Sequence, residues 1–199
     1  MSYLLSIHIP TIVGRETQFD KLYNDIKSQI FEGQLESLVE CIFEKDNKEI
    51  SIGKKRQKLY ERSKGKFSWQ IDDDDSIDSD AIIDIVDYIR ETDCDYIGSY
   101  ERCNVDGLIF TTKHSNQFLD WCDYKAEGCV YGRTPFFKDP ILTEYCLKVG
   151  VKDMRFGEDH DFARRMKESG LIQNEVFHED ILYYYRRIST PHNERYGIR

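Results

Sequence analysis

The chain has 199 residues, of which 40% are hydrophobic and 33% are charged, and its formal net charge is −9 at pH 7. This composition is typical of a globular protein with one core and excludes a wholly disordered chain. The acidic balance argues against broad nucleic-acid binding, which needs a basic surface. No stretch approaches the roughly 20 apolar residues of a membrane span.

Two further features bear on where the protein works. The first residues lack the basic region and the long apolar core of a signal peptide. The six cysteines are scattered without the spacing of a zinc site, which predicts reduced thiols. We therefore expect a soluble, cytoplasmic protein with a single domain over residues 1–199.

Short apolar segments alternate with helical patterns, which predicts an α/β fold with crossover helices. A first strand is expected over 4–9, ended by Pro10. A helix follows, with apolar residues at helical spacing from Phe19 to Ile30 and Gly33 placed to end it. Strands are then expected over 38–43 and 67–71, with a basic segment between them.

The second half of the chain continues this alternation. The stripe from Ile82 to Ile89 predicts a helix capped by Asp78 or Ser79. Strands are expected near 96–97 and 108–110. Asp139-Pro140 pairs a capping residue with proline at the first helical position, which predicts a helix up to Gly150. A short helix over 159–168 and a strand over 181–185 complete the pattern.

Four adjacent carboxylates, Asp72 to Asp75, follow the strand expected over 67–71. Buried together they would repel, so they must be solvated, protonated or neutralised by a cation. Their place at the carboxyl end of a strand is where open α/β sheets bind ligands. Carboxylate oxygens suit Mg²⁺ or Mn²⁺, with substrate phosphates completing the shell. A metal site and a solvated acidic turn both remain open.

Four other features are candidates for chemistry. Residues 54–66 hold seven cations opposed only by Glu61, which indicates either phosphate contacts or a solvated helix face. Gly157-Glu158-Asp159 leads into a helix, as a cap or as a general base. His178 follows an apolar segment and is a candidate metal ligand. Aromatic side chains that could either stack on a ligand or belong to the core are Trp121, Tyr124, Tyr131 and those of the segment 133–137.

Taken together, these segments resemble a glycosyltransferase of the GT-A fold, of the family 2 type, over residues 4–187. The strand ending in Ile9-Pro10-Thr11 is similar to the family's first strand and nucleotide-contacting loop. Residues 52–57, Ile-Gly-Lys-Lys-Arg-Gln, look like its Gly-x-x-Arg-Asn element. Residues 64–75 are similar to the strand that leads into its DxD motif, and Gly157-Glu158-Asp159 to its Glu-Asp motif.

The resemblance implies an α/β fold with a mostly parallel central sheet flanked by helices, and a donor-binding half over about 1–100 with an acceptor side over about 101–199. It implies metal-dependent, inverting transfer of a sugar from a nucleoside-diphosphate sugar, with UDP favoured as the nucleotide, to a hydroxyl of a saccharide or glycan acceptor. Mn²⁺ or Mg²⁺ would be held by Asp74, with Asp72 near the metal or the ribose and His178 as a further candidate. Nucleotide contacts fall on Thr11, Asp46, Arg56, Asp72 and Asp73, and the catalytic base on Asp159.

Several alternatives stay open at this point. Retaining transfer is possible because the fold alone does not fix stereochemistry. A degenerate GT-A module would bind metal or nucleotide sugar without transfer, and a structural protein would use the acidic turn only for solubility. A sugar-nucleotide pyrophosphorylase is disfavoured, because residues 11–15 contain a single glycine rather than a glycine-rich phosphate loop.

Overall fold

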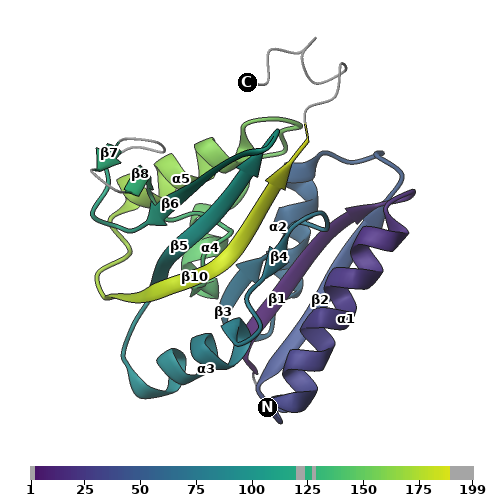
Figure 1. The fold of residues 1–199 in the computed structure, drawn as a ribbon, viewed down its shortest axis with the longest axis horizontal. Coiled ribbons are helices and arrows are strands. Elements are labelled where there is room, and N and C mark those ends of the chain that lie inside the picture. Colours follow the sequence, from purple (N-terminus) through teal and green to yellow (C-terminus); the bar gives the residue numbers. More distant parts are fainter. Residues whose placement is uncertain (1–2, 120–123, 127–128, 189–199) are drawn as a thin grey trace.

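A mixed sheet runs through the centre of the molecule, with helices on both of its faces (Figure 1). The computed structural model describes residues 3–119, 124–126 and 129–188. The helices are α1 (Glu16–Glu32), α2 (Ile52–Arg62), α3 (Ala81–Glu91), α4 (Thr143–Val149) and α5 (Glu158–Ser169). The strands are β1 (Tyr3–Ile12), β2 (Val39–Asp46), β3 (Gly65–Gln70), β4 (Ser76–Ile77), β5 (Tyr96–Val105), β6 (Leu108–His114), β7 (Tyr124–Ala126), β8 (Cys129–Arg133), β9 (Ile141–Leu142) and β10 (Glu175–Arg187).

The strand order places the ends of β1, β2 and β3 at one edge of the sheet. β1 pairs in parallel with β2 on one side and with β3 on the other. In this register Ile12 lies beside Asp46, so β1 and β2 end together, and β3 ends at Gln70 on the same side. β9 pairs antiparallel with both β3 and β5, while β10 runs parallel to β5. The α/β class with a mostly parallel central sheet flanked by helices is confirmed.

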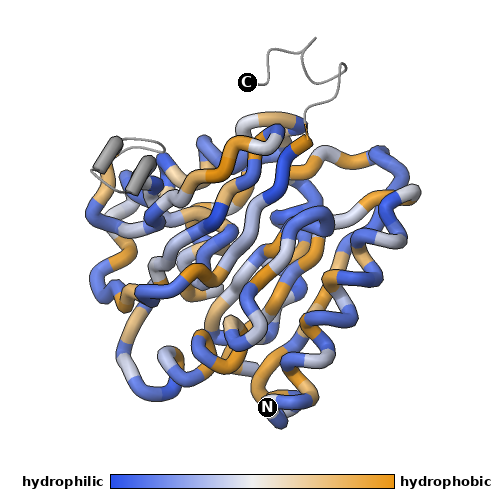
Figure 2. The backbone as a smooth tube through the Cα atoms, in the orientation of Figure 1, coloured by the Kyte–Doolittle hydropathy of each residue, from blue (hydrophilic) through white to orange (hydrophobic). Residues whose placement is uncertain are grey.

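Two hydrophobic clusters, one on each face, hold the helices to the sheet. One cluster packs α1 and α3 against β1 and β3 through residues such as Ile26, Ile85 and Trp69. The other joins α2, α4 and α5 through Tyr60, Cys146 and Phe162. In Figure 2 hydrophobic residues recur along α1 between hydrophilic ones, which is the pattern of a helix that buries one side.

Most of the elements lie where the sequence placed them, but one helix start was wrong. The N–H of Gly33 donates to the carbonyl of Gln29 at 3.0 Å and ends α1 as expected. Asp139-Pro140 does not begin a helix, because Ile141 and Leu142 form β9 and α4 starts only at Thr143. Pairing with β3 and β5 overrides the local signal, since it satisfies backbone groups that a helix start would leave without partners.

Other differences concern caps and lengths. Asp80 is the N-cap residue of α3 and makes no side-chain capping bond, so the predicted cap by Asp78 or Ser79 is wrong. The basic segment forms α2, whose start is capped by Ser51 through its side chain and the N–H of Lys54. β5, β6 and β10 are longer than the short apolar runs suggested, because cross-strand pairing extends them into polar sequence.

No helix in the described part of the chain is long and apolar enough to cross a membrane.

Candidate active site

Asp72 to Asp75 form a tight turn at the edge of the sheet where β1, β2 and β3 end. The turn closes when the N–H of Asp75 donates to the carbonyl of Asp72 at 3.1 Å. It is tied to β1 just before it begins, because the N–H of Ile71 donates to the carbonyl of His8 at 2.9 Å. The four carboxylates are therefore held by the sheet rather than by a loose loop.

Arg15, at the start of α1, neutralises the middle of the run. Its Nη1 lies 2.6 Å from Asp73 Oδ1 and 3.2 Å from Asp74 Oδ2. The hydroxyl of Thr11 donates to the other oxygen of Asp73 at 2.7 Å. Asp73 is thus fully engaged by the β1–α1 connection, whereas Asp74 shares only part of one guanidinium.

Lys138 approaches the run from the opposite side. Its Nζ lies 2.8 Å from Asp75 and 3.5 Å from Asp72, above the rings of Tyr183 and Tyr185. The hydroxyl of Tyr183 donates to Asp75 at 2.7 Å. Burial raises the pKa of Asp75 to about 6, although the charge of Lys138 opposes this. Burial lowers the pKa of Lys138, but the charges of Asp75 and Asp72 outweigh it and the net shift is upward.

Arg56 of α2 connects the turn to the start of α5. Its Nη2 lies 2.8 Å from Asp72, and its Nε lies 3.4 Å from Glu158. Its guanidinium carbon stands 3.8 Å from the centre of the Phe137 ring. Burial raises the pKa of Asp72, but the charges of Arg56 and Lys138 outweigh burial and lower it overall. Asp72 is therefore ionised and held between two cations.

The four aspartate side chains differ in how far they are exposed to solvent. The side chains of Asp74 and Asp72 are 44% and 24% exposed, against 2% for Asp73 and 0% for Asp75. Burial also raises the pKa of Asp74. Within the described residues, no group of three or more His, Cys, Asp or Glu side chains is arranged to hold a metal ion. A metal here would have one or two carboxylates as protein ligands and would need substrate oxygens and water.

A first pocket opens beside the turn with a volume of ≈ 410 Å³, and we call it the donor pocket because it collects residues that the sequence predicts to contact the donor nucleotide. Its lining comes from the end of β1, from Arg15 just before α1, from α2, from the aspartate turn and from the segment before α5. It collects four of the predicted nucleotide contacts, Thr11, Arg56, Asp72 and Asp73, together with Asp74. The remaining lining residues are Pro10, Ile12, Arg15, Ile52, Lys55, Arg155 and Phe156.

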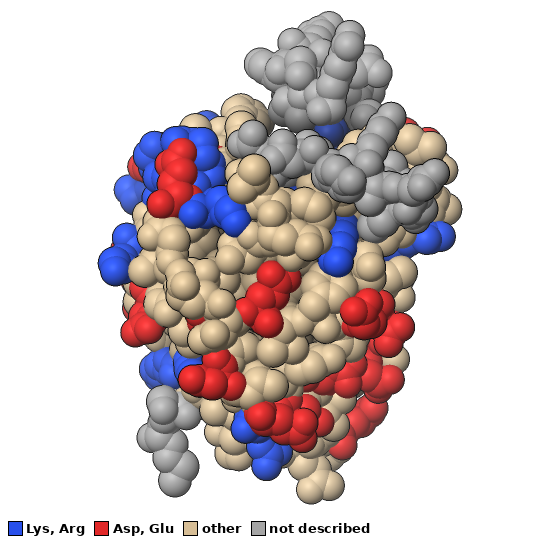
Figure 3. All heavy atoms as spheres, turned by 90° about the vertical axis from the view of Figure 1, so that its left-hand side faces the viewer, with Lys and Arg blue, Asp and Glu red and all other residues tan. Residues whose placement is uncertain are grey.

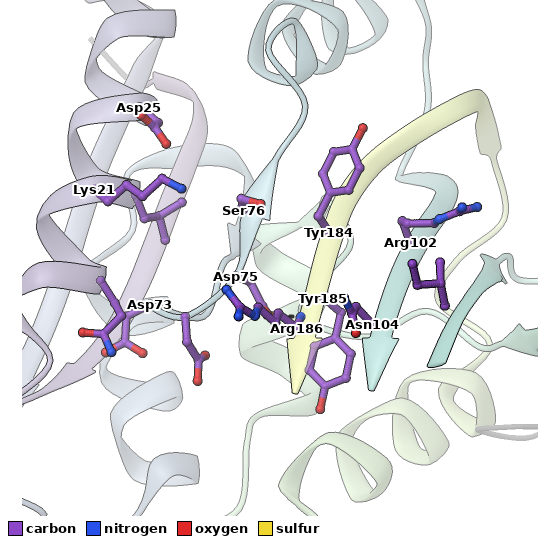
Figure 4. A pocket seen from close by; sticks show the side chains of 14 residues that line it. Lys21, Asp25, Asp73, Asp75, Ser76, Arg102, Asn104, Tyr184, Tyr185 and Arg186 are labelled. Atoms are coloured by element: carbon purple, nitrogen blue, oxygen red, sulfur yellow. Dashed lines mark hydrogen bonds between the residues drawn. The ribbon is translucent and has the colours of Figure 1, made fainter. Parts of the chain in front are cut away.

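A second pocket of ≈ 380 Å³ lies on the other side of the same turn and shares Asp73 and Asp74 with the donor pocket. In Figure 4, Lys21 and Asp25 of α1 stand on one side of it, with Tyr184, Arg102 and Asn104 on the other. Asp74 therefore borders two adjoining pockets, one of them lined by α1, β5 and β10.

Asp159 lies at the N-terminus of α5, directly after Glu158. Gly157 precedes the helix with a φ of 74°, a left-handed conformation that glycine adopts without strain. Glu158 is buried against Arg56, and burial raises its pKa although the charge of Arg56 lowers it. Asp159 is only partly buried and lies close enough to Arg56 to influence it electrostatically. The structure thus brings the Glu-Asp pair to the same arginine as Asp72.

Three of the predicted site residues, Asp46, Asp159 and His178, do not line the donor pocket. The carboxylate of Asp46 pairs with Lys55, which does line it, and accepts a hydrogen bond from the N–H of Ile50. His178 packs against α3, with its Nε2 3.8 Å from Asp84 and its ring edge-on to Tyr88. It lines an acidic hollow with Asp78, Asp80, Asp84, Glu179 and Asp180 rather than the aspartate turn. Acidic side chains also gather in the lower right of the face shown in Figure 3.

Sequence reasoning missed Arg15, Lys138 and Phe156. None of them falls within a motif, and only their positions in the fold bring them to the aspartates or to the donor pocket. Of the aromatic residues considered for an acceptor, Phe136 and Phe137 are buried in the core. Trp121 and the side chain of Tyr124 lie outside the described residues.

The fold can now be compared with known proteins. No family model matches the sequence, and no curated protein matches it. Among solved structures, S. aureus TarS 1–349 in complex with UDP-GlcNAc matches with a TM-score of 0.65 and 16% identity, over 96% of this chain and 61% of that one. The same fragment in complex with UDP matches with a TM-score of 0.61 and 15% identity, over 98% and 63%.

A more distant likeness points to the same fold. The catalytic domain of Drosophila β1,4-galactosyltransferase 7, in complex with xylobiose, matches with a TM-score of 0.50 and 10% identity, over 94% of this chain and 66% of that one. The chain has the GT-A fold of glycosyltransferases, as the resemblance implied. It spans 61% of the TarS fragment.

Proposed function

We propose that this protein is a metal-dependent inverting glycosyltransferase. It would transfer a sugar from a nucleoside-diphosphate sugar, with UDP as the favoured nucleotide, to a hydroxyl of a saccharide acceptor. The observation that carries the proposal is the position of Arg56, which contacts Asp72 in the turn and Glu158 beside Asp159. One buried cation thereby contacts both the turn that carries the predicted metal ligands and the residue next to the predicted base, which supports assigning them to one site.

The donor's diphosphate would lie over the turn, where positive charge is already in place. Arg15 and Arg56 line the donor pocket beside Asp74. Guanidinium groups suit phosphate oxygens because they present planar pairs of N–H donors. The neighbours support a nucleotide-sugar donor, since TarS structures hold UDP-GlcNAc or UDP. The donor site then draws on both halves of the chain, because Arg155 and Phe156 belong to the second half.

The residues at the turn fit a divalent cation that is shared with the substrate. Asp74 keeps the most exposed carboxylate of the run and borders the donor pocket, and Asp72 is the next most exposed. These hard oxygen ligands suit Mn²⁺ or Mg²⁺, which would offset the charge that develops on the leaving diphosphate. We leave His178 out of this set because it contacts α3 instead.

Asp159 is the residue to which we assign the proton transfer. It would accept the proton of the acceptor hydroxyl while that oxygen bonds to the anomeric carbon and the bond to the diphosphate breaks. The nucleoside diphosphate leaves with the electrons of the broken bond, so a single displacement inverts the anomeric configuration. Glu158, which is buried against Arg56, would fix the start of α5 and with it the position of Asp159.

The first experiment asks whether the donor site exists. Calorimetric titration of UDP and of UDP-GlcNAc, each with and without Mn²⁺, should show binding that Mn²⁺ strengthens. Absence of any nucleotide binding would overturn the proposal and favour a protein whose acidic turn serves solubility alone.

The second experiment separates an enzyme from a binding module. Donor hydrolysis and transfer to saccharide acceptors should be measured for the wild type and for Asp159→Asn. We expect Asp159→Asn to bind UDP normally and to lose transfer by about 100-fold or more. Binding without turnover in the wild type would indicate a degenerate module. Proton NMR of the product's anomeric centre distinguishes inversion from retention.

A further inference from the structure

The segment between α4 and α5 is fastened to the start of α2. The N–H of Gly53 donates to the carbonyl of Met154 at 3.0 Å, and the hydroxyl of Ser51 donates to Asp153. Gly53 is needed here, because a Cβ at this position would lie 1.9 Å from the carbonyl oxygen of Lys152. Backbone contacts on α2 therefore hold this segment directly beside the donor pocket.

Arg155 and Phe156 continue this segment over the pocket. Nη1 of Arg155 donates to the carbonyl of Lys48 at 3.3 Å, which adds an anchor at the end of the β2–α2 connection. Phe156 follows it, lines the donor pocket and is 64% exposed. An aromatic ring left in water on a fastened backbone keeps a large apolar surface that a ligand can cover.

The donor pocket has further apolar lining besides Phe156. Pro10 and Ile12, at the end of β1, and Ile52, at the start of α2, contribute to it. The cations and carboxylates of the pocket are contributed mainly by α2 and by the aspartate turn. A ligand with a charged end and a flat aromatic end matches this division, and a nucleoside diphosphate has both.

We infer that Phe156 is the aromatic contact for the nucleobase of the donor. This inference rests on the proposed function and deepens it, since it names the side chain that recognises the nucleoside rather than the diphosphate. The base stacks on Phe156 within the donor pocket, which Pro10 and Ile12 also line, and the diphosphate is directed toward Arg56 and the aspartates. Because the segment is already fastened by Ser51 and Gly53, little ordering is required when the ligand binds.

Two variants and a matched control test the inference by calorimetry with Mn²⁺ present. Phe156→Ala removes the ring, and Phe156→Trp keeps a stacking surface. Phe31→Ala removes an equally exposed ring on α1, 73% exposed and outside the donor pocket. The probes are UDP, which carries the base, and inorganic pyrophosphate, which does not.

We expect Phe156→Ala to weaken UDP binding by about 5- to 150-fold, the range measured for loss of one base–aromatic stack. Pyrophosphate binding should be unchanged, Phe156→Trp should bind UDP like the wild type, and Phe31→Ala should change neither. Thermal melts should show Phe156→Ala to be folded, because the ring contributes little to the core.

The outcomes distinguish this inference from the proposed function. If the wild type binds UDP and Phe156→Ala binds it equally well, the inference is wrong while the donor site stands. If Phe156→Ala weakens pyrophosphate as much as UDP, the ring acts on the shape of the site rather than on the base, and the inference is also wrong. If the wild type binds no UDP, the proposed function fails and the inference falls with it.

Discussion

Replacing Arg56 by methionine should be among the most destabilising single changes in this fold. The substitution keeps much of the apolar stem that packs on Phe137 but removes the guanidinium from Asp72 and Glu158. Arg56 and Glu158 are buried, and Asp72 is largely so, so water cannot fully replace the lost cation. The carboxylates of Asp72 and Glu158 then repel each other in a buried site, where water screens their charges poorly.

The magnitude follows from these contacts. Removing one partner of a buried ion pair costs about 3–5 kcal/mol in the free energy of unfolding. The lower end applies here, because Lys138 still lies 3.5 Å from Asp72. For a domain of this size each kcal/mol lowers Tm by about 2–4 °C, which gives a loss of about 6–12 °C for about 3 kcal/mol.

The assay is urea denaturation followed by fluorescence of the buried Trp69, with Arg164→Met as the control. Arg164 is 48% exposed and pairs with Glu168 on the surface of α5 at 2.9 Å, so its loss should change stability by under about 1 kcal/mol. The double variant Arg56→Met/Asp72→Asn should lose less free energy of unfolding than the two single variants lose in sum. A loss below about 1 kcal/mol for Arg56→Met, or strict additivity in the double variant, would refute the reasoning.

Three further changes have defined outcomes. Asp74→Asn should abolish the Mn²⁺-dependent gain in UDP affinity by calorimetry while leaving Tm nearly unchanged; retention of the gain would exclude Asp74 as the metal ligand. Gly53→Ala should lower the free energy of unfolding by about 1–3 kcal/mol in urea, because its Cβ would meet a carbonyl at 1.9 Å; unchanged stability would show that the segment 151–157 moves freely. Burial lowers the pKa of His114, but the carboxylates of Asp139 and Glu101 outweigh it and raise that pKa to about 9. The stability that protonated His114 contributes is fully present below about pH 6.5 and is lost as pH rises through about 9. The urea midpoint of the wild type should therefore fall over that window, and the midpoint of His114→Gln should not. Parallel pH profiles for the two proteins would contradict the assignment.

The sequence by itself determined those features that are written within single elements. The apolar spacing from Phe19 to Ile30 located α1, and Gly33 ended it. The aspartate run after an apolar strand, and the Glu-Asp pair at the start of a helix, were both visible as local patterns. Their order along the chain resembles that of GT-A glycosyltransferases, and this resemblance, rather than any single pattern, implied the fold.

Only the tertiary structure decided which of the four aspartates are neutralised by cations and which stays exposed. Arg15 reaches Asp73 across 58 positions of sequence and Lys138 reaches Asp75 across 63, so no spacing rule connects them. The same packing placed His178 against α3 and turned the residues after Asp139-Pro140 into a strand. Periodicity reports neighbours within one helix or strand, whereas charge neutralisation depends on how separate elements meet. Asp74 is left as the most exposed carboxylate because packing, and not its own sequence context, encloses the other three more fully and leaves Asp74 to share Arg15 with Asp73.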